Sequence, residues 1–369
     1  MPVLVLDDPP EGARELVAAL GAAGAFAHLD ERRLVVVARR SVLANAAESV
    51  GEAARAVAAE LLRALDADRT RPAALRLRGY RLDLAERARV MAILNVTPDS
   101  FYDRGRYSGV ERARERAHGL VALGADVIDI GGQSYAHWNP RVAEEEERAR
   151  VVPVVEALVR DGIGVPLSID TFKSGVAEAA LAAGADLIND CSGLADDRLA
   201  GVVARYDAAL VVMHLKGELN VRAPDYPYED ALAEILAFLR ERCERALAAG
   251  VARDSLAVDP GLEFGKEPRT DLEILERFGD LRSLGYPILF AASRKSFIGR
   301  VFNRPAKELL VPSLATAALG IAAGAALVRV HDVAETVELA TMLAAVSKSN
   351  RERIPLAPAM PSTPTAGAQ

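Results

Sequence analysis

Cysteine is scarce in this chain: Cys191 and Cys243 are the only two among 369 residues. They lie far apart, and their spacing is not of the type that binds metals. The sequence therefore gives no indication of a disulfide framework, and a reducing cytoplasm is the expected location.

Other absences narrow the class of protein further. No apolar run approaches the roughly 18 residues that span a bilayer, and Asp7 and Asp8 interrupt the start where a signal peptide would be basic and then apolar. The phosphate-binding patterns GxxxxGK[ST] and GxGxxG are both missing. A net charge of −7 disfavours nucleic acid as a partner. We expect a protein without membrane or nucleic-acid partners, in which a local cluster of cations can still bind a small anion.

What is present suits a large buried core, since 51% of the residues are hydrophobic and 26% are charged. Residues 1–85 predict a small N-terminal α/β appendage. Strands are expected at 3–6 and 34–37, helices at 11–20 and 41–65, and a hairpin of 75–77 with 80–82 around Gly79. No catalytic constellation stands out in this part of the chain.

From residue 86 to 349 apolar runs alternate regularly with helical stretches. The predicted strands are 90–96, 126–130, 166–170, 186–190, 209–214, 256–259, 287–293 and 327–332, and the predicted helices are 110–123, 144–160, 173–183, 197–206, 228–249, 271–278, 313–322 and 334–347. Eight such units favour a (β/α)₈ TIM barrel, with a doubly wound open sheet as the alternative. Residues 350–369 are rich in Pro, Ala and Thr and predict a disordered tail.

Polar residues follow each predicted strand, where a barrel places its active site. They are Asn95, Asp129, Gln133, Ser134, Asp170, Asn189, Asp190, His214, Asp259, Ser293, Arg294, Lys295, Arg329, His331 and Asp332. A single Asp at such a point is most often a helix cap, and a single His is more often a core or rim residue. The ring as a whole carries carboxylates and amides on its middle strands and cations on its last two. Independent caps would not be expected to divide in this way.

This division indicates a ligand with two different ends. Asp170, Asn189 and Asp259 suit a flat heterocycle rich in N–H groups, and Lys295 can donate to a ring carbonyl or nitrogen. Arg329 and His331 suit an anion such as diphosphate. Asn95 can bind a Mg²⁺ that bridges the diphosphate oxygens, because Mg²⁺ prefers oxygen ligands and keeps several waters.

The motifs resemble the dihydropteroate synthase family over residues 89–348. They are MAILNVTPDSF, GADVIDIGG, SIDT, LINDCSG, VDPG followed by FGK, SRKSFIG and RVHDV, in family order. The resemblance implies a cytoplasmic transferase of folate biosynthesis, commonly a homodimer. It would condense 6-hydroxymethyl-7,8-dihydropterin diphosphate with p-aminobenzoate and release diphosphate, with Mg²⁺ as cofactor.

The same resemblance assigns roles to individual residues. Pterin binding falls to Asp170, Asn189, Met213, Asp259, Phe264 and Lys295, diphosphate and Mg²⁺ binding to Asn95, Arg329 and His331, and catalysis to Lys295, Arg329 and His331. Of these, only Asn95 is predicted to ligate the metal.

The chain departs from the family after the second strand. Where the family reads Thr-Arg-Pro-Gly, this chain reads Tyr135-Ala136-His137-Trp138. Ser134, Tyr135, His137 and Trp138 form the predicted acceptor loop, in which aromatic rings would stack on an aromatic amine. Two smaller departures are Glu263 and Ala291, where the family has Gly. A Glu263 side chain that faced inward would oppose a carboxylate ligand.

These departures leave three hypotheses open. The first is a synthase that acts on p-aminobenzoate or a related aryl amine. The second is a non-catalytic pterin-binding paralogue. The third is a folate-dependent methyltransferase, which SRKSFIG and RVHDV disfavour because a methyl carrier offers no diphosphate for Arg329 and His331.

Overall fold

The computed structural model describes residues 3–7, 9–29, 33–97, 106–135, 141–220 and 227–349. The predicted tail at 350–369 lies outside these residues, as do Asp99, Ala136, His137 and Trp138.

A small α/β unit occupies the start of the chain. Its elements are β1 (Val3–Asp7), α1 (Ala13–Ala22), β2 (Phe26–Leu29), β3 (Arg33–Val37), α2 (Arg40–Glu48) and α3 (Glu52–Arg69). The strands form an antiparallel sheet in the order β1-β3-β2. Apolar side chains of β3 pack with α1, α2 and α3 in a separate core.

The helix predicted over 41–65 is in fact two helices. α2 ends at Glu48, and Gly51 precedes α3. The backbone N–H of Gly51 donates to Glu15 Oε1 at 2.8 Å, which ties the break to α1. Ser49-Val50-Gly51 interrupts the Ala/Leu-rich pattern at this break, and the prediction passed over that interruption.

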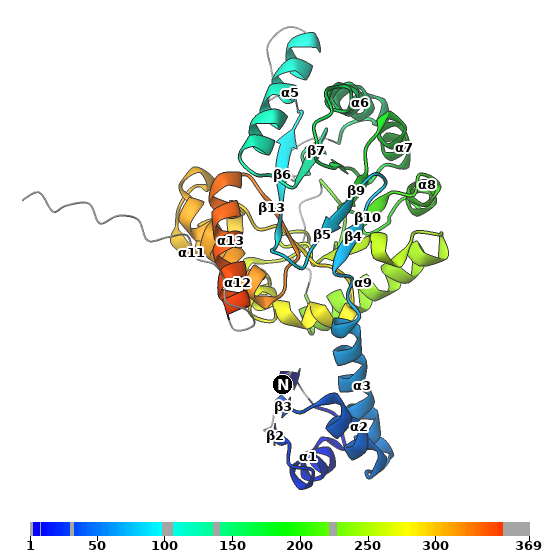
Figure 1. The fold of residues 1–369 in the computed structure, drawn as a ribbon, viewed down its shortest axis with the longest axis vertical. Coiled ribbons are helices and arrows are strands. Elements are labelled where there is room, and N and C mark those ends of the chain that lie inside the picture. Colours follow the sequence, from blue (N-terminus) through cyan, green and yellow to red (C-terminus); the bar gives the residue numbers. More distant parts are fainter. Residues whose placement is uncertain are drawn as a thin grey trace, which may run out of the picture.

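A short hairpin, β4 (Ala74–Arg76) and β5 (Arg81–Asp83), follows α3 and agrees with the prediction. Leu75 and Leu77 are fully buried against apolar side chains from seven barrel strands. Arg76 pairs with Asp207 and Asp254, which directly precede two of those strands. The hairpin therefore plugs the N-terminal end of the barrel (Figure 1).

The main sheet consists of eight parallel strands. They are β6 (Arg89–Asn95), β7 (Val127–Gly131), β8 (Leu167–Asp170), β9 (Leu187–Asp190), β10 (Ala209–Met213), β11 (Leu256–Asp259), β12 (Leu289–Phe290) and β13 (Leu327–Val330). Their order is β11-β10-β9-β8-β7-β6-β13-β12. A parallel bridge between Val258 and Ile288 joins the two ends of the sheet. The predicted (β/α)₈ barrel is thereby confirmed over the open sheet.

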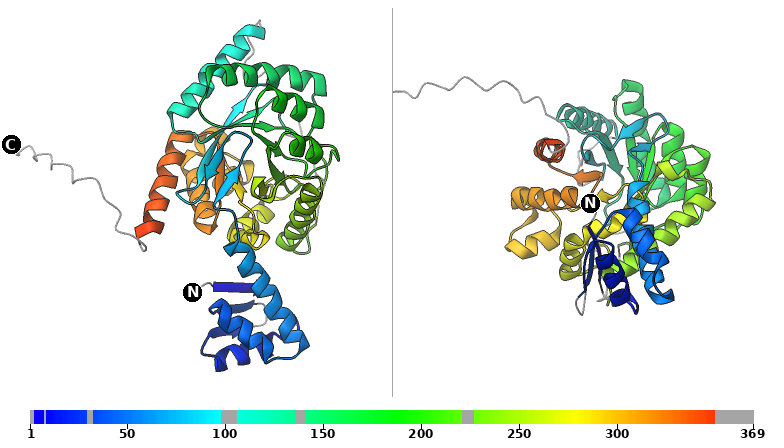
Figure 2. Two further views of the ribbon diagram at one scale, coloured as in Figure 1. Left: turned by 45° about the vertical axis from the view of Figure 1, so that its right-hand side comes forward. Right: turned by 60° about the horizontal axis from the view of Figure 1, so that its bottom comes forward.

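The helices surround this sheet (Figures 1 and 2). They are α5 (Arg106–Ala122), α6 (Glu144–Asp161), α7 (Ser174–Ala183), α8 (Leu199–Arg205), α9 (Ala231–Ala248), α10 (Pro268–Glu276), α11 (Ser296–Phe302), α12 (Leu310–Ala323) and α13 (Val333–Ser349). The short helix α11 was not predicted. None of the described helices combines the length and apolarity needed to cross a membrane.

The N-terminal unit joins the barrel through the end of α3 (Figure 2). Arg282, in the 3₁₀ helix η2 (Phe278–Leu284), donates to Asp68 with both Nε and Nη2, at 2.8 and 2.5 Å. Arg71 Nη1 donates to the carbonyl of Gly324 at 2.9 Å, directly before β13. These contacts lie at the N-terminal end of the strands. The described residues of this unit are therefore remote from the C-terminal strand ends.

Candidate active site

A buried carboxylate organises the interior of the barrel below the C-terminal strand ends. Asp129 in β7 has no exposed surface. Its Oδ1 accepts the Ser168 hydroxyl at 2.5 Å, and its Oδ2 accepts Asn189 Nδ2 at 3.2 Å. Arg329 Nε donates to the same Oδ2 at 2.6 Å. The sequence placed this residue only among the polar strand ends, and its pairing with Arg329 was not predicted.

Arg329 reaches across the barrel from β13 and binds two carboxylates. Besides Asp129, it contacts Asp170 of β8, with 2.7 Å between Nη2 and Oδ2. Burial alone would lower the pKa of Arg329, but the two carboxylates more than offset it and raise the pKa. The residue predicted for diphosphate and the residue predicted for the pterin ring are thus directly joined.

Asp170 is buried beside other acids, and this changes its ionisation. Burial raises its pKa from 3.8 to about 7; Arg329 opposes the rise, and the nearby Asp129 and Glu147 add to it. Asp259 of β11 is also buried, and burial raises its pKa while Lys295 opposes the rise. Asp259 Oδ1 accepts the backbone N–H of Gly261 at 2.6 Å.

Lys295 follows β12 and is held over the loop between β11 and α10. Its Nζ donates to the carbonyl of Leu262 at 2.6 Å and lies 5.0 Å from the centre of the Phe264 ring. The preceding residue, Arg294, has a φ of 59°, and its guanidinium contacts both oxygens of Asp332 at 2.9 and 2.7 Å. β12 has only two residues, so the predicted strand 287–293 is too long, and Arg294 lies in the turn that follows it.

An apolar wall lies beside these polar groups. Cys191, Met213 and Leu219 are buried there, with Tyr135, Phe172, Leu215 and Phe264 packed against them. Met213 and Phe264 are thus placed together, as the family motifs imply. A flat ring between this wall and the carboxylates would have apolar contacts on its face and polar contacts at its edge.

His331 lies beside Ser293 at the end of β13. Ser293 Oγ is 3.1 Å from His331 Nδ1 and accepts the backbone N–H of His331 at 3.2 Å. Desolvation and the nearby Arg329 lower the pKa of His331 to about 4. A neutral ring can accept the serine proton at Nδ1 and then carries its own proton on Nε2.

Asn95 ends β6 with its side chain exposed, next to Gly131 of β7. A Cβ atom on Gly131 would lie 3.4 Å from Asn95 Oδ1 and 3.7 Å from Asp170 Oδ2. The amide oxygen and the carboxylate therefore border the same glycine. Among the described residues, no group of three His, Cys, Asp or Glu is arranged to hold a metal ion.

His214 has a structural contact that its position in the sequence did not indicate. Its Nδ1 is 2.9 Å from Lys266 Nζ, and Lys266 also donates to the carbonyls of Gly261 and Phe264. Burial and the adjacent lysine lower the pKa of His214 to about 2. This neutral histidine supports the loop after β11 rather than a reacting group.

Two residues that depart from the family also have defined contacts. Tyr135 donates from its hydroxyl to the carbonyl of Asp170 at 3.2 Å, and its ring centre is 6.0 Å from that of Phe172. Glu263 has a φ of 69°, and its Oε1 accepts the backbone N–H of Phe297 at 2.9 Å. Glu263 is therefore engaged at the start of α11. Of the predicted acceptor loop, Ser134 and Tyr135 are described.

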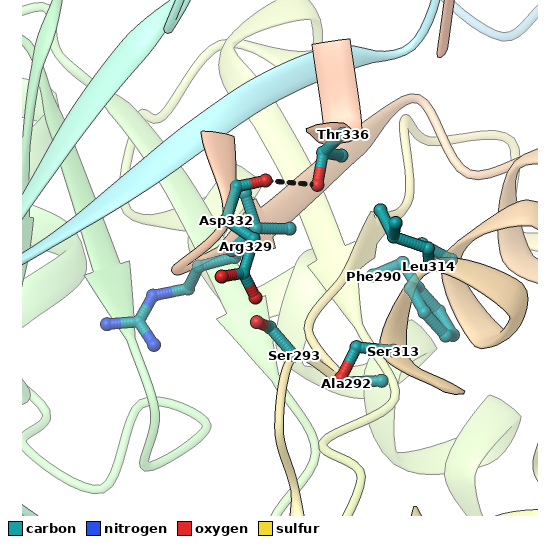
Figure 3. Close-up of a pocket in the computed structure, with 10 residues that line it drawn as sticks. Phe290, Ala292, Ser293, Ser313, Leu314, Arg329, Asp332 and Thr336 are labelled. Atoms are coloured by element: carbon teal, nitrogen blue, oxygen red, sulfur yellow. Dashed lines mark hydrogen bonds between the residues drawn. The ribbon is translucent and has the colours of Figure 1, made fainter. Parts of the chain in front are cut away.

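A small cavity of about 10 Å³ lies behind Arg329, between the ends of β12 and β13 and helix α12. Figure 3 shows Ser293, Asp332 and Thr336 around it, with the guanidinium of Arg329 pointing away. Its volume is close to that of one water molecule. It is too small for a substrate, so the strand ends on the other side of Arg329 form the candidate site.

Known proteins share this barrel. Dihydropteroate synthase of Bacillus subtilis (strain 168) is 41% identical over 266 residues, which are 72% of this chain and 90% of the relative. The structure of Xanthomonas albilineans dihydropteroate synthase with 4-aminobenzoic acid is 40% identical, with a TM-score of 0.70 over 74% of this chain and 98% of that one. The Burkholderia cenocepacia enzyme complexed with 7,8-dihydropteroate is 41% identical, with a TM-score of 0.68 over 77% and 99%.

The family model described as "Pterin binding enzyme" matches residues 91–331. This match runs from within β6 to His331 after β13 and includes all the polar strand ends described above except Asp332. The chain belongs to the pterin-binding enzyme family.

Proposed function

We propose that this chain is a dihydropteroate synthase. It condenses 6-hydroxymethyl-7,8-dihydropterin diphosphate with p-aminobenzoate and releases diphosphate, in folate biosynthesis. The observation that carries the proposal is the buried cluster in which Arg329 pairs with both Asp129 and Asp170. This cluster places acceptors for the N–H groups of a pterin directly beside a cation for the leaving group.

The side chains act by positioning and by fixed charge. Asp170, Asn189 and Asp259 accept from or orient the pterin edge, and Lys295 donates to it. The amine nitrogen of p-aminobenzoate forms a bond to the pterin CH₂, the C–O bond to diphosphate breaks, and the amine loses a proton. Arg329 and His331 Nε2–H stabilise the negative charge that develops on the leaving oxygens. Holding both reactants side by side supplies much of the remaining rate enhancement.

The test is an assay of diphosphate and pteroate formation by the purified chain. It contains Mg²⁺ and the pterin diphosphate, with and without p-aminobenzoate. Diphosphate release that depends on p-aminobenzoate and matches pteroate formation is expected. Tight binding of the pterin diphosphate without turnover for any amine would instead identify a non-catalytic paralogue. Binding of methyl-tetrahydrofolate without binding of the pterin diphosphate would identify the methyltransferase.

A related aryl amine as acceptor is the second candidate. It is supported by Tyr135, which packs with Phe172 beside Phe264 and Met213. This aromatic wall accommodates a benzene ring without specifying its substituent. Turnover with other aryl amines and none with p-aminobenzoate would favour this candidate.

Pterin affinity is expected to rise as the pH increases from 6 to 8. A pterin N–H needs an ionised Asp170, and the pKa of about 7 means that a proton must leave before the ring binds. Affinity should fall by up to about tenfold for each pH unit below 7. Fluorescence titration with 6-hydroxymethylpterin measures it. An Asp170→Asn variant should bind weakly with no such rise, whereas a rise equal to that of the wild type would exclude Asp170 as its source.

The same group links folding to pH. The folded pKa of Asp170 lies above its ordinary value of 3.8. The stabilisation from its proton is therefore complete below about pH 4 and is lost as the pH rises through about 7. Ionised Asp170 favours pterin binding at high pH, whereas protonated Asp170 stabilises the fold at low pH.

Magnesium is the proposed cofactor, held by Asn95 together with the diphosphate of the substrate. Asn95 offers an exposed amide oxygen beside Asp170, which suits a cation that prefers oxygen ligands. The described residues provide no preformed cage, and this fits an ion that arrives with the diphosphate. The ion would neutralise charge on the leaving group.

Removal of magnesium with EDTA is expected to abolish pteroate formation, and added Mg²⁺ should restore it. Binding of 6-hydroxymethylpterin, which lacks phosphate, should be unchanged by EDTA. An Asn95→Ala variant should require about tenfold or more additional Mg²⁺ for half-maximal rate, because a metal ligand is lost. Full activity in EDTA would contradict the proposal.

A homodimer is also proposed, through the outer face of α12 and α13. Large apolar side chains are exposed there: Val311 (72%), Leu319 (58%), Met342 (64%) and Val346 (56%). Figure 1 places the two helices next to each other on the outside of the barrel. Such clustering is typical of protein interfaces.

Charge introduced on this face is expected to separate the protomers. Sedimentation velocity should show a dimer for the wild type and a monomer for Val311→Lys/Met342→Lys. Val159→Lys, at an exposed apolar position on α6, should remain dimeric. A monomeric wild-type protein, or a double variant that stays dimeric, would exclude this interface.

A further inference from the structure

Lys173, between β8 and α7, has contacts on both sides of the predicted acceptor loop. Its Nζ donates to Gln133 Oε1 at 2.8 Å, before the loop, and to the carbonyl of Val142 at 2.6 Å, after it. It also pairs with Oε2 of Glu147 on α6. Gln133 Oε1 and the Val142 carbonyl oxygen both accept from the same nitrogen, so they cannot be farther apart than the sum of the two hydrogen-bond lengths. One side chain therefore fixes the distance between the two ends of the loop.

These three contacts use every N–H that a lysine ammonium group has. Lys173 is therefore not available as a donor to a substrate. Its position differs in this respect from that of Lys295, which makes one contact with protein and faces the pterin site. The geometry indicates a supporting function for Lys173 rather than ligand binding.

The contacts continue from Lys173 to the segment after β10. Gln133 is 3% exposed, and its Nε2 donates to Asn220 Oδ1 at 2.7 Å. Asn220 Nδ2 in turn donates to the carbonyl of Ser134 at 2.9 Å. On the other side of the loop, Arg141 Nη2 contacts Glu218 Oε2 at 2.9 Å and the Leu219 carbonyl at 3.2 Å. Both ends of the loop are thus tied to residues 218–220.

Tyr135 lies at the end of this chain of contacts. It directly follows Ser134, whose carbonyl Asn220 holds, and its ring packs near Phe172, the neighbour of Lys173. Leu219, between the two tied residues of the β10 segment, belongs to the same apolar wall as Tyr135. A shift of Lys173 would therefore move two sides of that wall together.

We propose that Lys173 is a positioning residue for the acceptor site, which it shapes by joining Gln133 to Val142 and so fixing Tyr135. This inference rests on the proposed function, since it assigns Tyr135 and its neighbour Phe172 to the aryl amine and leaves Met213 and Phe264 of the same wall to the pterin. It predicts a selective effect: the acceptor is misplaced while the pterin contacts on β8, β9 and β11 stay in position.

The simplest test is Lys173→Met. The KM for p-aminobenzoate is expected to rise about 10–100-fold, because a displacement of about 1 Å near a reacting group has effects of this size. The KM for the pterin diphosphate should change much less, because Glu147 acts on Asp170 only through its charge. Arg114→Met is the matched control: Arg114 pairs with Asp161 at the opposite end of α6, and its loss should change neither constant. An equal rise in both KM values would overturn the proposal.

A second variant separates positioning from simple charge neutralisation. Glu147 is fully buried and its Oε1 has no hydrogen-bond partner among the described residues, so loss of Lys173 leaves a buried charge that destabilises the fold. Lys173→Met/Glu147→Gln removes that charge, and its Tm should return towards the wild-type value while the KM for p-aminobenzoate stays high. Recovery of that KM would show that Lys173 only neutralises Glu147, and would overturn the proposal. A wild-type protein that forms no pteroate would contradict the proposed function itself, and the acceptor site with it.

Discussion

Arg329→Met is expected to lower pteroate formation by at least about 10³-fold and the free energy of unfolding by about 3–5 kcal/mol. The activity is expected to fall because Arg329 is the proposed counter-ion of the leaving diphosphate. The stability falls because Asp129 and Asp170, which Arg329 contacts at 2.6 and 2.7 Å, are left buried without a counter-ion. Stopped-time assays and urea unfolding measure the two effects separately.

Two further variants separate these effects. Arg329→Met/Asp129→Asn should regain stability without regaining activity, because one buried charge disappears while the cation is still missing. Arg87→Met is the matched control at the other end of the barrel, where Arg87 makes a two-bond pair with Asp126 at 2.7 and 3.0 Å. It should lose stability and keep its kcat. An Arg329→Met protein with normal turnover would refute the site.

The place of Arg329 at a strand end predicted that it belongs to the site. The sequence did not predict which residues it pairs with. Asp129 is 200 residues away in the chain and Asp170 is 159 residues away. Only closure of the barrel brings β13 next to β6 and within reach of β7 and β8. Strand period tells which side a residue faces, but it does not tell how far an arginine side chain reaches across the interior. The ring of polar strand ends was predictable, and its internal ion pairs were not.

Local backbone shape accounts for other differences between expectation and structure. Glu263 was expected to oppose a carboxylate ligand if it faced inward, yet its φ of 69° directs the side chain to the N–H of Phe297. Arg294, with a φ of 59°, lies in the turn between β12 and α11. Both residues occupy conformations that side chains seldom adopt, so patterns of hydrophobicity carry no information about them.

The barrel repeat was easier to predict than the helix break in the N-terminal unit. The eight-fold alternation of apolar runs and helices was a strong signal because each unit repeats it. The break between α2 and α3 is marked in the sequence only by Ser49 and Gly51, and a contact from Gly51 to Glu15 of α1 supports it. Single tertiary contacts of this kind lie beyond what periodicity can predict.

Lys295→Ala is expected to reduce kcat/KM for the pterin diphosphate by about 10²–10³-fold. Lys295 supplies a donor to the ring, and its charge also opposes the upward shift in the pKa of Asp259. Without it the pKa of Asp259 should rise further. The variant therefore loses a donor, and at a given pH a larger share of Asp259 is protonated than in the wild type.

The second effect gives the variant a recognisable pH dependence. Because a raised carboxyl pKa means that the ionised form returns only at higher pH, the kcat/KM of Lys295→Ala should reach its plateau at a higher pH than that of the wild type. Lys307→Ala, at an exposed lysine in the 3₁₀ helix after α11, is the control and should follow the wild-type profile. A Lys295→Ala profile parallel to the wild type would show that Lys295 acts as a donor alone. Unchanged kcat/KM would remove Lys295 from the pterin site altogether.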